Sequence, residues 1–421
     1  MRASEMWQTS TGSGITIAVL DSGVDDSLTD LKGQVLDGKD YSDQRGDEHT
    51  DLAGHGTNIA SLIAATGARG SVSGSYGLAP GAKILPVRMR YTEEDYGQVD
   101  AGAQFSRTMS KAIRYAADTD AQIINISMGA YNAPNRRNVD TPQLTSAVRY
   151  AIDQGKLIFA AVGNDGDTTN LAGFPAATAG VVGVGASDKN AKALPLSQRG
   201  PQVDLMAPGT DMIHACLGGT RVCRTNGTSD ATAIASASAA LVWSKHPDWT
   251  NHQVLRVLLN TAGKPKNGDE RTDSVGHGTV RPRVALKSPG DPGPADEYPL
   301  PDLAASTASP SPETSAHSDS ETLTPGTGDT ETAASETSDH GNVTWWVTAA
   351  GATAVAIGIA VALAVLGTRR RRVTQISPTV PPPPPHFPYG HAQQHWPDTP
   401  PQGHTTEPFL RGGTRDADEH G

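Results

Sequence analysis

The sequence predicts an α/β fold in which a parallel sheet is covered by helices on both faces, and three observations lead to this prediction. Short apolar runs rich in β-branched residues alternate with longer segments of helical periodicity. The first run, residues 15–20, is almost entirely apolar, which is typical of a strand buried on both faces. After residue 287 Pro, Ser, Thr and acidic residues become dominant. We therefore expect one folded domain over residues 1–287, followed by appendages.

The expected elements follow one another as such a sheet requires. The strands are the apolar runs at residues 15–20, 83–87, 122–127, 157–162 and 180–185. The helices and the closing segment are expected at residues 58–65, 106–117, 143–154, 231–243, 254–259 and 276–286. The helix over residues 231–243 is rich in small residues, so we expect it to run buried through the domain. Reactive residues of such sheets gather at the carboxyl ends of the strands.

Three short glycine-rich segments, far apart in the chain, each carry one residue of a possible hydrolytic triad. Asp21 ends the first strand, His55 lies in Gly-His-Gly-Thr, and Ser229 follows Asn-Gly-Thr at the start of a helix. A serine hydroxyl becomes a useful nucleophile when a base removes its proton, and a histidine with a pKa near 6.5 suits that role. An ionised aspartate orients the imidazole and stabilises its charged form. The pattern predicts Ser229 as nucleophile, His55 as base and Asp21 as its partner.

Asn164 is the candidate for stabilising the oxyanion that such an attack creates. It follows the strand at residues 157–162, and its side-chain amide could supply one donor beside the Ser229 backbone N–H. Alternatively, the asparagine simply makes an Asx turn. Because the triad is present, we expect the oxyanion role.

Residues 12–287 resemble the catalytic domain of the subtilase (S8) serine peptidases. The matching segments are Val-Leu-Asp-Ser-Gly-Val (19–24), Gly-His-Gly-Thr (54–57), Asn-Ile-Ser-Met-Gly (125–129), Gly-Asn (163–164), Met-Ala-Pro-Gly (206–209) and Gly-Thr-Ser (227–229). The resemblance implies a subtilisin-like three-layer sandwich and a serine endopeptidase that acts on a polypeptide substrate through an acyl-enzyme. It also implies that Ser127, Met128 and Gly129 line the substrate cleft and pair with an extended peptide as an added strand.

The segments after the domain predict a membrane anchor. Residues 288–344 read as a disordered linker, because they contain too few apolar residues to fold. The uncharged run at 345–366 would span roughly 33 Å as a helix, which matches a bilayer, and we place the transmembrane helix at 345–368. The arginines at 369–372 predict a cytoplasmic, Pro-rich tail over 369–421 and a catalytic domain outside a cell membrane that the chain crosses once.

This architecture resembles the mycosins, membrane-anchored subtilases associated with type VII secretion, although the long Pro-rich tail departs from them. The resemblance implies secretion-system components as partners, beside the lipid bilayer. Residues 1–5 contain no apolar segment of the signal-peptide type, so we expect the natural start to lie upstream. The net charge of −11 argues against a nucleic-acid partner.

Cys216 and Cys223 are the two cysteines of the chain. The predicted extracytoplasmic position favours a disulfide between them over two unrelated buried thiols. Two thiols without further ligands do not suit a metal site. His49, Asp51 and His55 could be drawn as a metal cluster, but they lack the spacing of helical ligands. We expect no metal and no cofactor.

Two features leave alternatives open. Asp230 directly follows the predicted nucleophile, where its carboxylate would either repel the oxyanion or simply favour the positive end of a helix. His277 lies in a second Gly-His-Gly-Thr sequence, but this one belongs to the closing segment, so we do not expect His277 to be the base. The rival functions are a structural component of a secretion assembly, with dispensable or weak proteolysis, and a tethered binding module that uses the Pro-rich tail.

Overall fold

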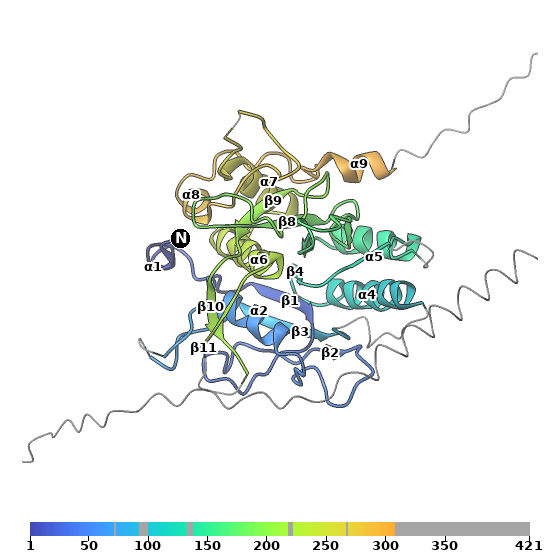
Figure 1. Ribbon diagram of the computed structural model, residues 1–421. Helices are drawn as coiled ribbons and strands as arrows, with labels where there is room; N and C mark the ends of the chain where they lie inside the picture. The colour runs from blue at the N-terminus through green and yellow to red at the C-terminus, as the bar shows by residue number, and fades with distance from the viewer. Residues whose placement is uncertain (71–72, 92–99, 133–137, 218–221, 267, 308–421) are drawn as a thin grey trace, which may run out of the picture. The chain divides into compact units, whose positions relative to one another are not determined.

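The computed structural model describes residues 1–307 except 71–72, 92–99, 133–137, 218–221 and 267 (Figure 1). The chain divides into two units, Met1–His317 and Ser318–Gly421, and the second lies wholly outside the described residues. The transmembrane helix predicted at 345–368 and the tail at 369–421 therefore stay predictions. No helix of the described part is long and apolar enough to cross a membrane.

A seven-stranded sheet forms the centre of the first unit, and each of its strand pairings is parallel. In spatial order its strands are β2 (Lys39–Asp40), β3 (Lys83–Arg88), β1 (Thr16–Asp21), β4 (Ile123–Ile126), β6 (Leu157–Ala161), β8 (Val182–Ser187) and β9 (Leu205–Pro208). Strands β4, β6 and β8 are buried along their whole length, which explains their uninterrupted apolar sequences. The predicted α/β fold with a central parallel sheet is confirmed.

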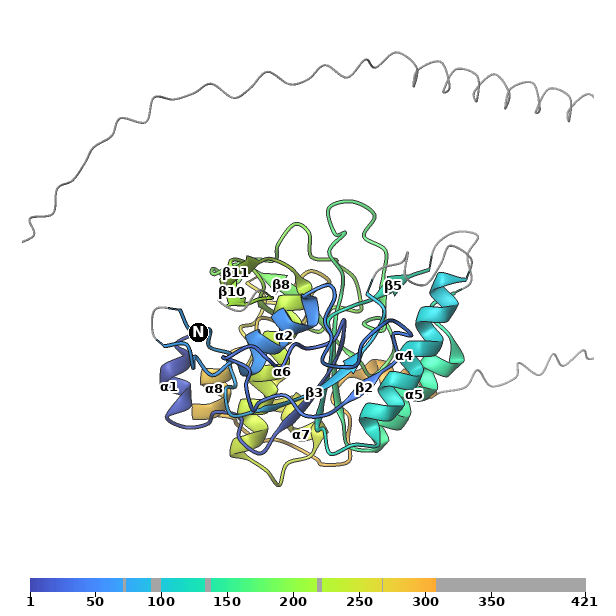
Figure 2. The ribbon, with the colours of Figure 1, turned by 90° about the horizontal axis from the view of Figure 1, so that it is seen from below.

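Successive residues of β1 point to two different cores, one on each face of the sheet. Ile17 and Val19 pack into the core beneath α2 (His55–Ala64), α6 (Thr228–Lys245), α7 (Asn251–Thr261) and α8 (Pro282–Lys287). Ala18 and Leu20 pack into the core beneath α4 (Ala101–Ala117) and α5 (Pro142–Asp153). Figure 2 shows α4 and α5 together on one side of the strands and α2 with α6 on the other. This is the three-layer arrangement that the sequence predicts.

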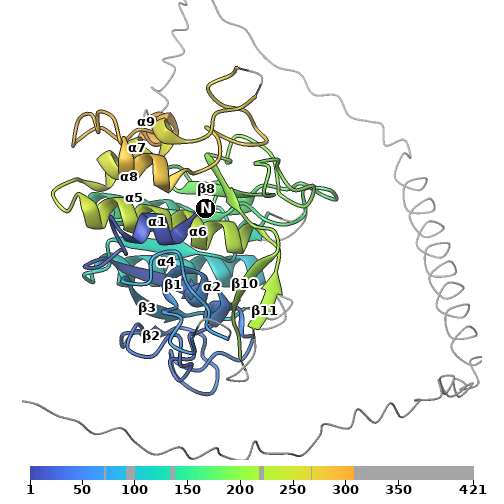
Figure 3. The ribbon, with the colours of Figure 1, turned by 90° about the vertical axis from the view of Figure 1, so that its left-hand side faces the viewer.

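Helix α6 runs through the interior, as Figure 3 shows. Apart from Ser229, its residues from Thr228 to Trp243 are all buried. Small side chains such as alanine and serine allow α6 to pack closely on β4, β6, β8 and β9. The prediction of a buried helix rich in small residues is confirmed.

Two short antiparallel pairs and two terminal helices complete the described part. β10 (Met212–Ala215) pairs with β11 (Val222–Thr225), and β5 (Ala130–Tyr131) pairs with β7 (Gly173–Phe174). Helix α1 (Ala3–Trp7) opens the chain, and α9 (Pro301–Thr307) ends the described residues.

The domain continues past residue 287, where the sequence predicted a disordered linker. The Tyr298 hydroxyl donates to the carbonyl of Gly180 at 2.6 Å, and Leu300 is only 2% exposed. The guanidinium of Arg256 binds the carbonyls of Pro292 and Pro294 at 2.7 and 2.8 Å. The predicted boundary is therefore too early. A few apolar side chains anchor residues 288–307, although the segment as a whole is polar.

Candidate active site

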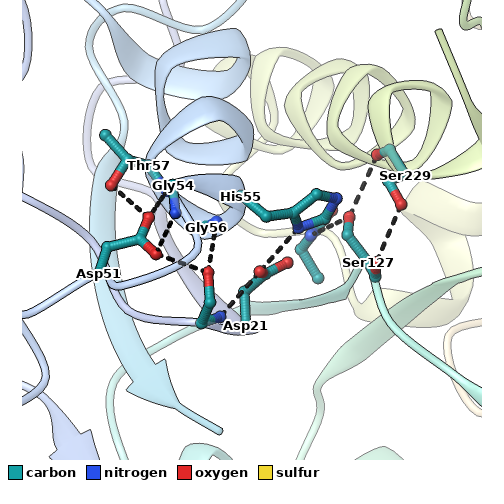
Figure 4. Close-up of polar contacts among 10 residues, drawn as sticks. Asp21, Asp51, Gly54, His55, Gly56, Thr57, Ser127 and Ser229 are labelled. Atoms are coloured by element: carbon teal, nitrogen blue, oxygen red, sulfur yellow. Dashed lines mark hydrogen bonds and ion pairs between the residues drawn. The ribbon is translucent and has the colours of Figure 1, made fainter. Parts of the chain in front are cut away.

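Asp21 is the last residue of β1 and His55 is the first residue of α2, and the two side chains meet (Figure 4). The Nδ1 atom of His55 lies 2.8 Å from Oδ1 of the buried Asp21. A carboxylate only accepts hydrogen bonds, so Nδ1 carries a proton, and in the neutral imidazole Nε2 keeps a free lone pair. The sequence-predicted contact between the two residues is present, and it leaves Nε2 in the form of a base.

Asp51 holds the start of α2, and the sequence analysis missed this role. Its two carboxylate oxygens accept four hydrogen bonds, from Ser22 Oγ (2.7 Å), Gly54 N–H (2.7 Å), Thr57 N–H (2.9 Å) and Thr57 Oγ1 (2.6 Å). These bonds satisfy backbone donors that every helix start leaves free. Asp51 therefore fixes the turn that carries His55. The available signal was an aspartate four residues before the histidine, which we considered only as a metal ligand.

Gly56 shows why the motif around His55 needs glycine. A Cβ atom at this position would lie 2.2 Å from the carbonyl oxygen of Gly23, which is too close for any side chain. Its backbone N–H also donates to Ser22 Oγ at 2.9 Å. The close approach brings the start of α2 against the end of β1, so that the imidazole reaches Asp21.

Ser229 lies in the first turn of α6, where it faces the segment after β4. Its Oγ donates to the carbonyl of Ser127 at 2.9 Å, and the Ser127 hydroxyl donates to the carbonyl of Ser229 at 3.1 Å (Figure 4). Ser229 Oγ thus bonds to Ser127 rather than to His55 Nε2. Hydrogen bonds between nucleophile and base are often long without substrate and tighten when it binds.

Asn164 is tied to the same helix start. Its Oδ1 accepts from the backbone N–H of Thr228 at 2.9 Å and from the Thr228 hydroxyl at 3.0 Å. Within the described part of the chain its Nδ2 has no hydrogen-bond partner, and the residue is exposed. The side chain therefore spans a long stretch of sequence instead of making the local Asx turn considered as the alternative. It presents a free N–H₂ group beside Ser229.

A cleft of about 290 Å³ lies beside Ser229 and Asn164. The residues that line it include Ser127, Met128, Gly129, Asn164 and Ser229. Tyr91, from the loop after β3, also lines the cleft, and its ring centroid lies 4.8 Å from that of His55. Sequence reasoning missed Tyr91, for which the signal was an aromatic residue just past a strand end. The predicted cleft residues and the predicted oxyanion residue share one hollow.

The hairpin of β10 and β11 borders α2 and carries the disulfide. Cys216 and Cys223 are bonded, with an S–S distance of 2.06 Å, so the predicted pairing is confirmed. His277 lies elsewhere, in the closing segment, where its backbone N–H donates to the carbonyl of Asp204. Among the described residues, no group of three or more His, Cys, Asp or Glu side chains could hold a metal ion.

The charges around His55 favour its protonated form. Burial lowers the pKa of His55, but the adjacent Asp21 carboxylate, with smaller contributions from Asp230 and Asp51, raises the pKa above its ordinary value. Burial also raises the pKa of Asp230 to about 6, against the opposing effects of the Thr225 hydroxyl and of His55. His55 and Asp230 are therefore electrostatically coupled across the site.

Sequence comparison places the chain in a known family. The profile described as the Subtilase family matches residues 12–278. The chain belongs to this family. It is 34% identical over 259 residues to the thermophilic serine proteinase of Bacillus sp. (strain AK1), covering 61% of this chain and 59% of that protein. It is 33% identical over 254 residues to subtilisin E of Bacillus subtilis (strain 168), covering 60% and 61% respectively. The match spans less than two thirds of either relative.

Several solved structures of similar fold come from type VII secretion systems. MycP1 from Mycobacterium smegmatis is 28% identical, with a TM-score of 0.60, over 70% of this subtilase and 85% of that chain. The MycP3 protease from the type VII (ESX-3) secretion system is 31% identical, with a TM-score of 0.57, over 68% and 85%. A chain in the periplasmic assembly of the ESX-5 inner membrane complex is 29% identical, with a TM-score of 0.58, over 71% and 85%. The predicted recognition is confirmed.

Proposed function

We propose that this subtilase is a serine endopeptidase that uses Asp21, His55 and Ser229 as its catalytic triad. The observation that carries the proposal is the 2.8 Å contact between His55 Nδ1 and Asp21, which leaves Nε2 as the base. The imidazole lies against Tyr91, which lines the same cleft as Ser229. In the first step Ser229 Oγ attacks the peptide carbonyl carbon while His55 Nε2 takes the hydroxyl proton. Asp21 keeps the imidazole in the right tautomer and stabilises the imidazolium that forms.

The oxyanion of the tetrahedral intermediate needs two donors, and the helix start offers them. Asn164 Nδ2 is held in place through its Oδ1, and the backbone N–H of Ser229 lies at the positive end of α6. When the intermediate collapses, His55 gives its proton to the departing amine and an acyl group remains on Ser229. Water then attacks the acyl group with His55 again as base, which frees the enzyme.

Extended peptides are the substrates that the cleft suits best. Ser127, Met128 and Gly129 follow β4 and line the cleft, and Gly129 has no side chain to cover its backbone. An extended peptide could pair with this segment as an added strand, so that main-chain hydrogen bonds hold it across Ser229. This geometry favours cleavage inside a chain.

Labelling with a fluorophosphonate tests the peptidase function. We expect the full chain to acquire one adduct, located at Ser229 by peptide mass spectrometry, and to hydrolyse unfolded protein. Ser229→Ala should lose both the adduct and the hydrolysis. Ser244→Ala, at the opposite end of α6, serves as the matched control and should keep both. A folded wild-type chain that takes no label would contradict the proposal.

We further propose that the enzyme is anchored in a cell membrane with its catalytic domain outside the cytoplasm. The uncharged run predicted to span the bilayer at 345–368 and the arginines after it support this topology. Added protease should degrade the N-terminal domain of intact cells but spare a tag on the C-terminus. Deletion of residues 345–368 should release the domain from the membrane. A domain that is protected in intact cells would contradict the topology.

The second candidate function is a structural part of a type VII-like secretion assembly, with weak or dispensable proteolysis. The similar chain within the ESX-5 periplasmic assembly supports it. Replacement of the gene by the Ser229→Ala form separates the two functions. Secretion that continues with the inactive form but stops on deletion of the gene would favour the structural role. Secretion that stops with both would favour proteolysis.

A further inference from the structure

A second set of polar side chains lies against the residue that follows Ser229. Nε2 of the fully buried His214 lies 3.0 Å from the Thr225 hydroxyl, and the same hydroxyl lies 2.9 Å from Oδ1 of Asp230. Asp230 is only 4% exposed, and its carboxylate accepts no other hydrogen bond from the described residues. His214 and Thr225 come from β10 and β11, the hairpin closed by the Cys216–Cys223 disulfide. None of the roles assigned so far uses these three side chains.

The hydrogen bonds in this set can be satisfied only if it holds an extra proton. His214 Nδ1 faces the carbonyl of Ala215 at 3.0 Å, and because a carbonyl only accepts, Nδ1 keeps its proton. The Thr225 hydroxyl has one proton, so it cannot donate to both His214 Nε2 and Asp230. If neither of those groups carries a proton, one of the two contacts brings lone pairs together.

One extra proton satisfies both contacts in either of two arrangements. In the first, the His214 imidazolium donates to the Thr225 oxygen, whose hydroxyl donates to the Asp230 carboxylate. In the second, the carboxylic acid of Asp230 donates to the Thr225 oxygen, whose hydroxyl donates to neutral His214. The arrangements differ by the shift of two protons along the chain of hydrogen bonds, and the net charge of the set is zero in both.

We propose that His214, Thr225 and Asp230 form a proton-sharing relay that keeps the position beside the nucleophile free of net negative charge. The three are positioning residues, because they act on the reaction through His55 and the oxyanion site rather than by touching substrate. Loss of the shared proton leaves the Asp230 carboxylate uncompensated at the start of α6. While the relay holds its proton, the Asp230 carboxyl can follow the nucleophile without repelling the oxyanion.

The surroundings of the relay agree with one shared proton. Burial raises the pKa of Asp230 to about 6 and lowers the pKa of His214, so the carboxyl holds a proton unusually well and the imidazole holds one less well. The titratable and charged groups that face the relay are His55 on α2, the neutral Tyr91 after β3, which interacts with Asp230, and the exposed Arg224–Asp211 pair on the hairpin side. His55 interacts with both ends of the relay, which couples the shared proton to the base.

The functional part of this inference rests on the proposed peptidase mechanism, but the relay itself can be tested without activity. The full chain carrying Ser229→Ala, with ¹⁵N-labelled histidine, is titrated by NMR from about pH 5 to about pH 10. The His214 signals are assigned by their loss in His214→Gln. We expect Nδ1 to stay protonated throughout, and the chemical shift of Nε2 to change in one step when the relay loses its shared proton.

Asp230→Asn should lower the midpoint of this step by at least about one pH unit, because the negative partner is gone. The asparagine N–H₂ can donate to Thr225, whose hydroxyl then donates to neutral His214. Asp248→Asn, beyond the other end of α6, is the matched control and should leave the midpoint unchanged. An unchanged midpoint in Asp230→Asn, or an unprotonated Nδ1, would overturn the relay whether or not the enzyme is active.

Kinetics test the positioning role in the active chain. His214→Gln keeps a donor to Thr225 but leaves the carboxylate uncompensated, so we expect kcat to fall on the order of tenfold with little change in KM. Combining His214→Gln with Asp230→Asn removes that charge and should restore most of kcat. A merely structural role predicts that the double variant is no better than His214→Gln. The pH profile of kcat/KM should lose the ionisation of the relay in Asp230→Asn, and retention of that ionisation would overturn the role.

Discussion

Helices α2 and α6 each deliver one reactive residue in their first turn, and each has a buried carboxyl beside that residue, but the two carboxyls have different surroundings. At α2, Asp51 meets four donors, two of them backbone N–H groups. At α6, Asp230 meets a single hydroxyl among the described residues, and that hydroxyl also faces His214. The donors around a buried carboxyl decide whether it is a fixed negative charge or a site that holds a proton.

The difference suits what each helix start has to do. In the proposed mechanism His55 becomes positive during the reaction, so negative charges near it are favourable. In the same mechanism Ser229 is attached to a developing oxyanion, so a fixed negative charge beside it would be unfavourable. The same residue type therefore serves opposite requirements, according to the donors that the fold places around it.

The same substitution at both carboxyls tests this comparison most sharply. Asp51→Asn turns an N–H₂ group toward donors that have no other acceptor, and we expect a loss of about 3–5 kcal/mol in the free energy of unfolding. Asp230→Asn should cost less than about 1 kcal/mol, because the amide can replace the protonated acid. Urea unfolding in the Ser229→Ala background measures both. Equal costs for the two variants would contradict the comparison.

The proposed role of Asn164 as a hydrogen-bond donor to the oxyanion, at the start of α6, is tested by Asn164→Ala. We expect kcat to fall about 10²–10³-fold, or roughly 2.7–4 kcal/mol, with a small effect on KM; the magnitude is the one known for the equivalent asparagine of subtilisin, a relative of this chain. Asn190→Ala, in the exposed turn after β8, provides the control. A comparable rise in KM with an unchanged kcat would show that Asn164 binds substrate instead of the oxyanion.

Asp204 is a third buried carboxyl, and like that of Asp230 it meets few hydrogen-bond donors. Burial raises its pKa to about 8, and its Oδ2 accepts the N–H of Gly183 at 2.8 Å. Since an aspartate in the unfolded chain titrates near 3.9, the folded state binds more protons between these values and stability falls as pH rises. The slope is at most about 1.4 kcal/mol per pH unit.

Asp204→Asn should flatten this dependence and raise the melting temperature on the alkaline side. Thermal unfolding of Ser229→Ala with and without Asp204→Asn, measured from acidic to alkaline pH, provides the check. Asp248→Asn serves as the exposed control. If Asp204→Asn leaves the slope unchanged, Asp204 is ionised in the folded state and the rule drawn from Asp51 and Asp230 does not extend to it.

Much of the site could be predicted because it lies in short motifs. Gly56 and Gly23, which approach closely, lie in two of these motifs, and so do Thr228 and Asn164, whose Oδ1 accepts the hydrogen bonds from Thr228. The sheet was predictable for a similar reason, since burial on both faces leaves continuous apolar runs.

The parts that could not be predicted depend on pairings far apart in the chain. The His214–Thr225 contact requires the register of the β10–β11 hairpin, which no residue pattern displays. Asp51 was visible, but its role depends on Ser22 from another loop. The segment 288–307 was assigned to the linker because average composition hides single anchors such as Tyr298 and Leu300.

The central claim, that Ser229 is activated by His55 under the control of Asp21, is tested most directly by the rate at which a fluorophosphonate modifies Ser229. In the wild type we expect the rate constant to rise with pH through the ionisation of His55, which lies above the ordinary histidine value because neighbouring carboxylates raise the pKa of His55. Asp21→Asn should lower the plateau by about 10⁴-fold, since it favours the wrong tautomer. A rate constant that is insensitive to Asp21→Asn, or an adduct on another residue, would contradict the account.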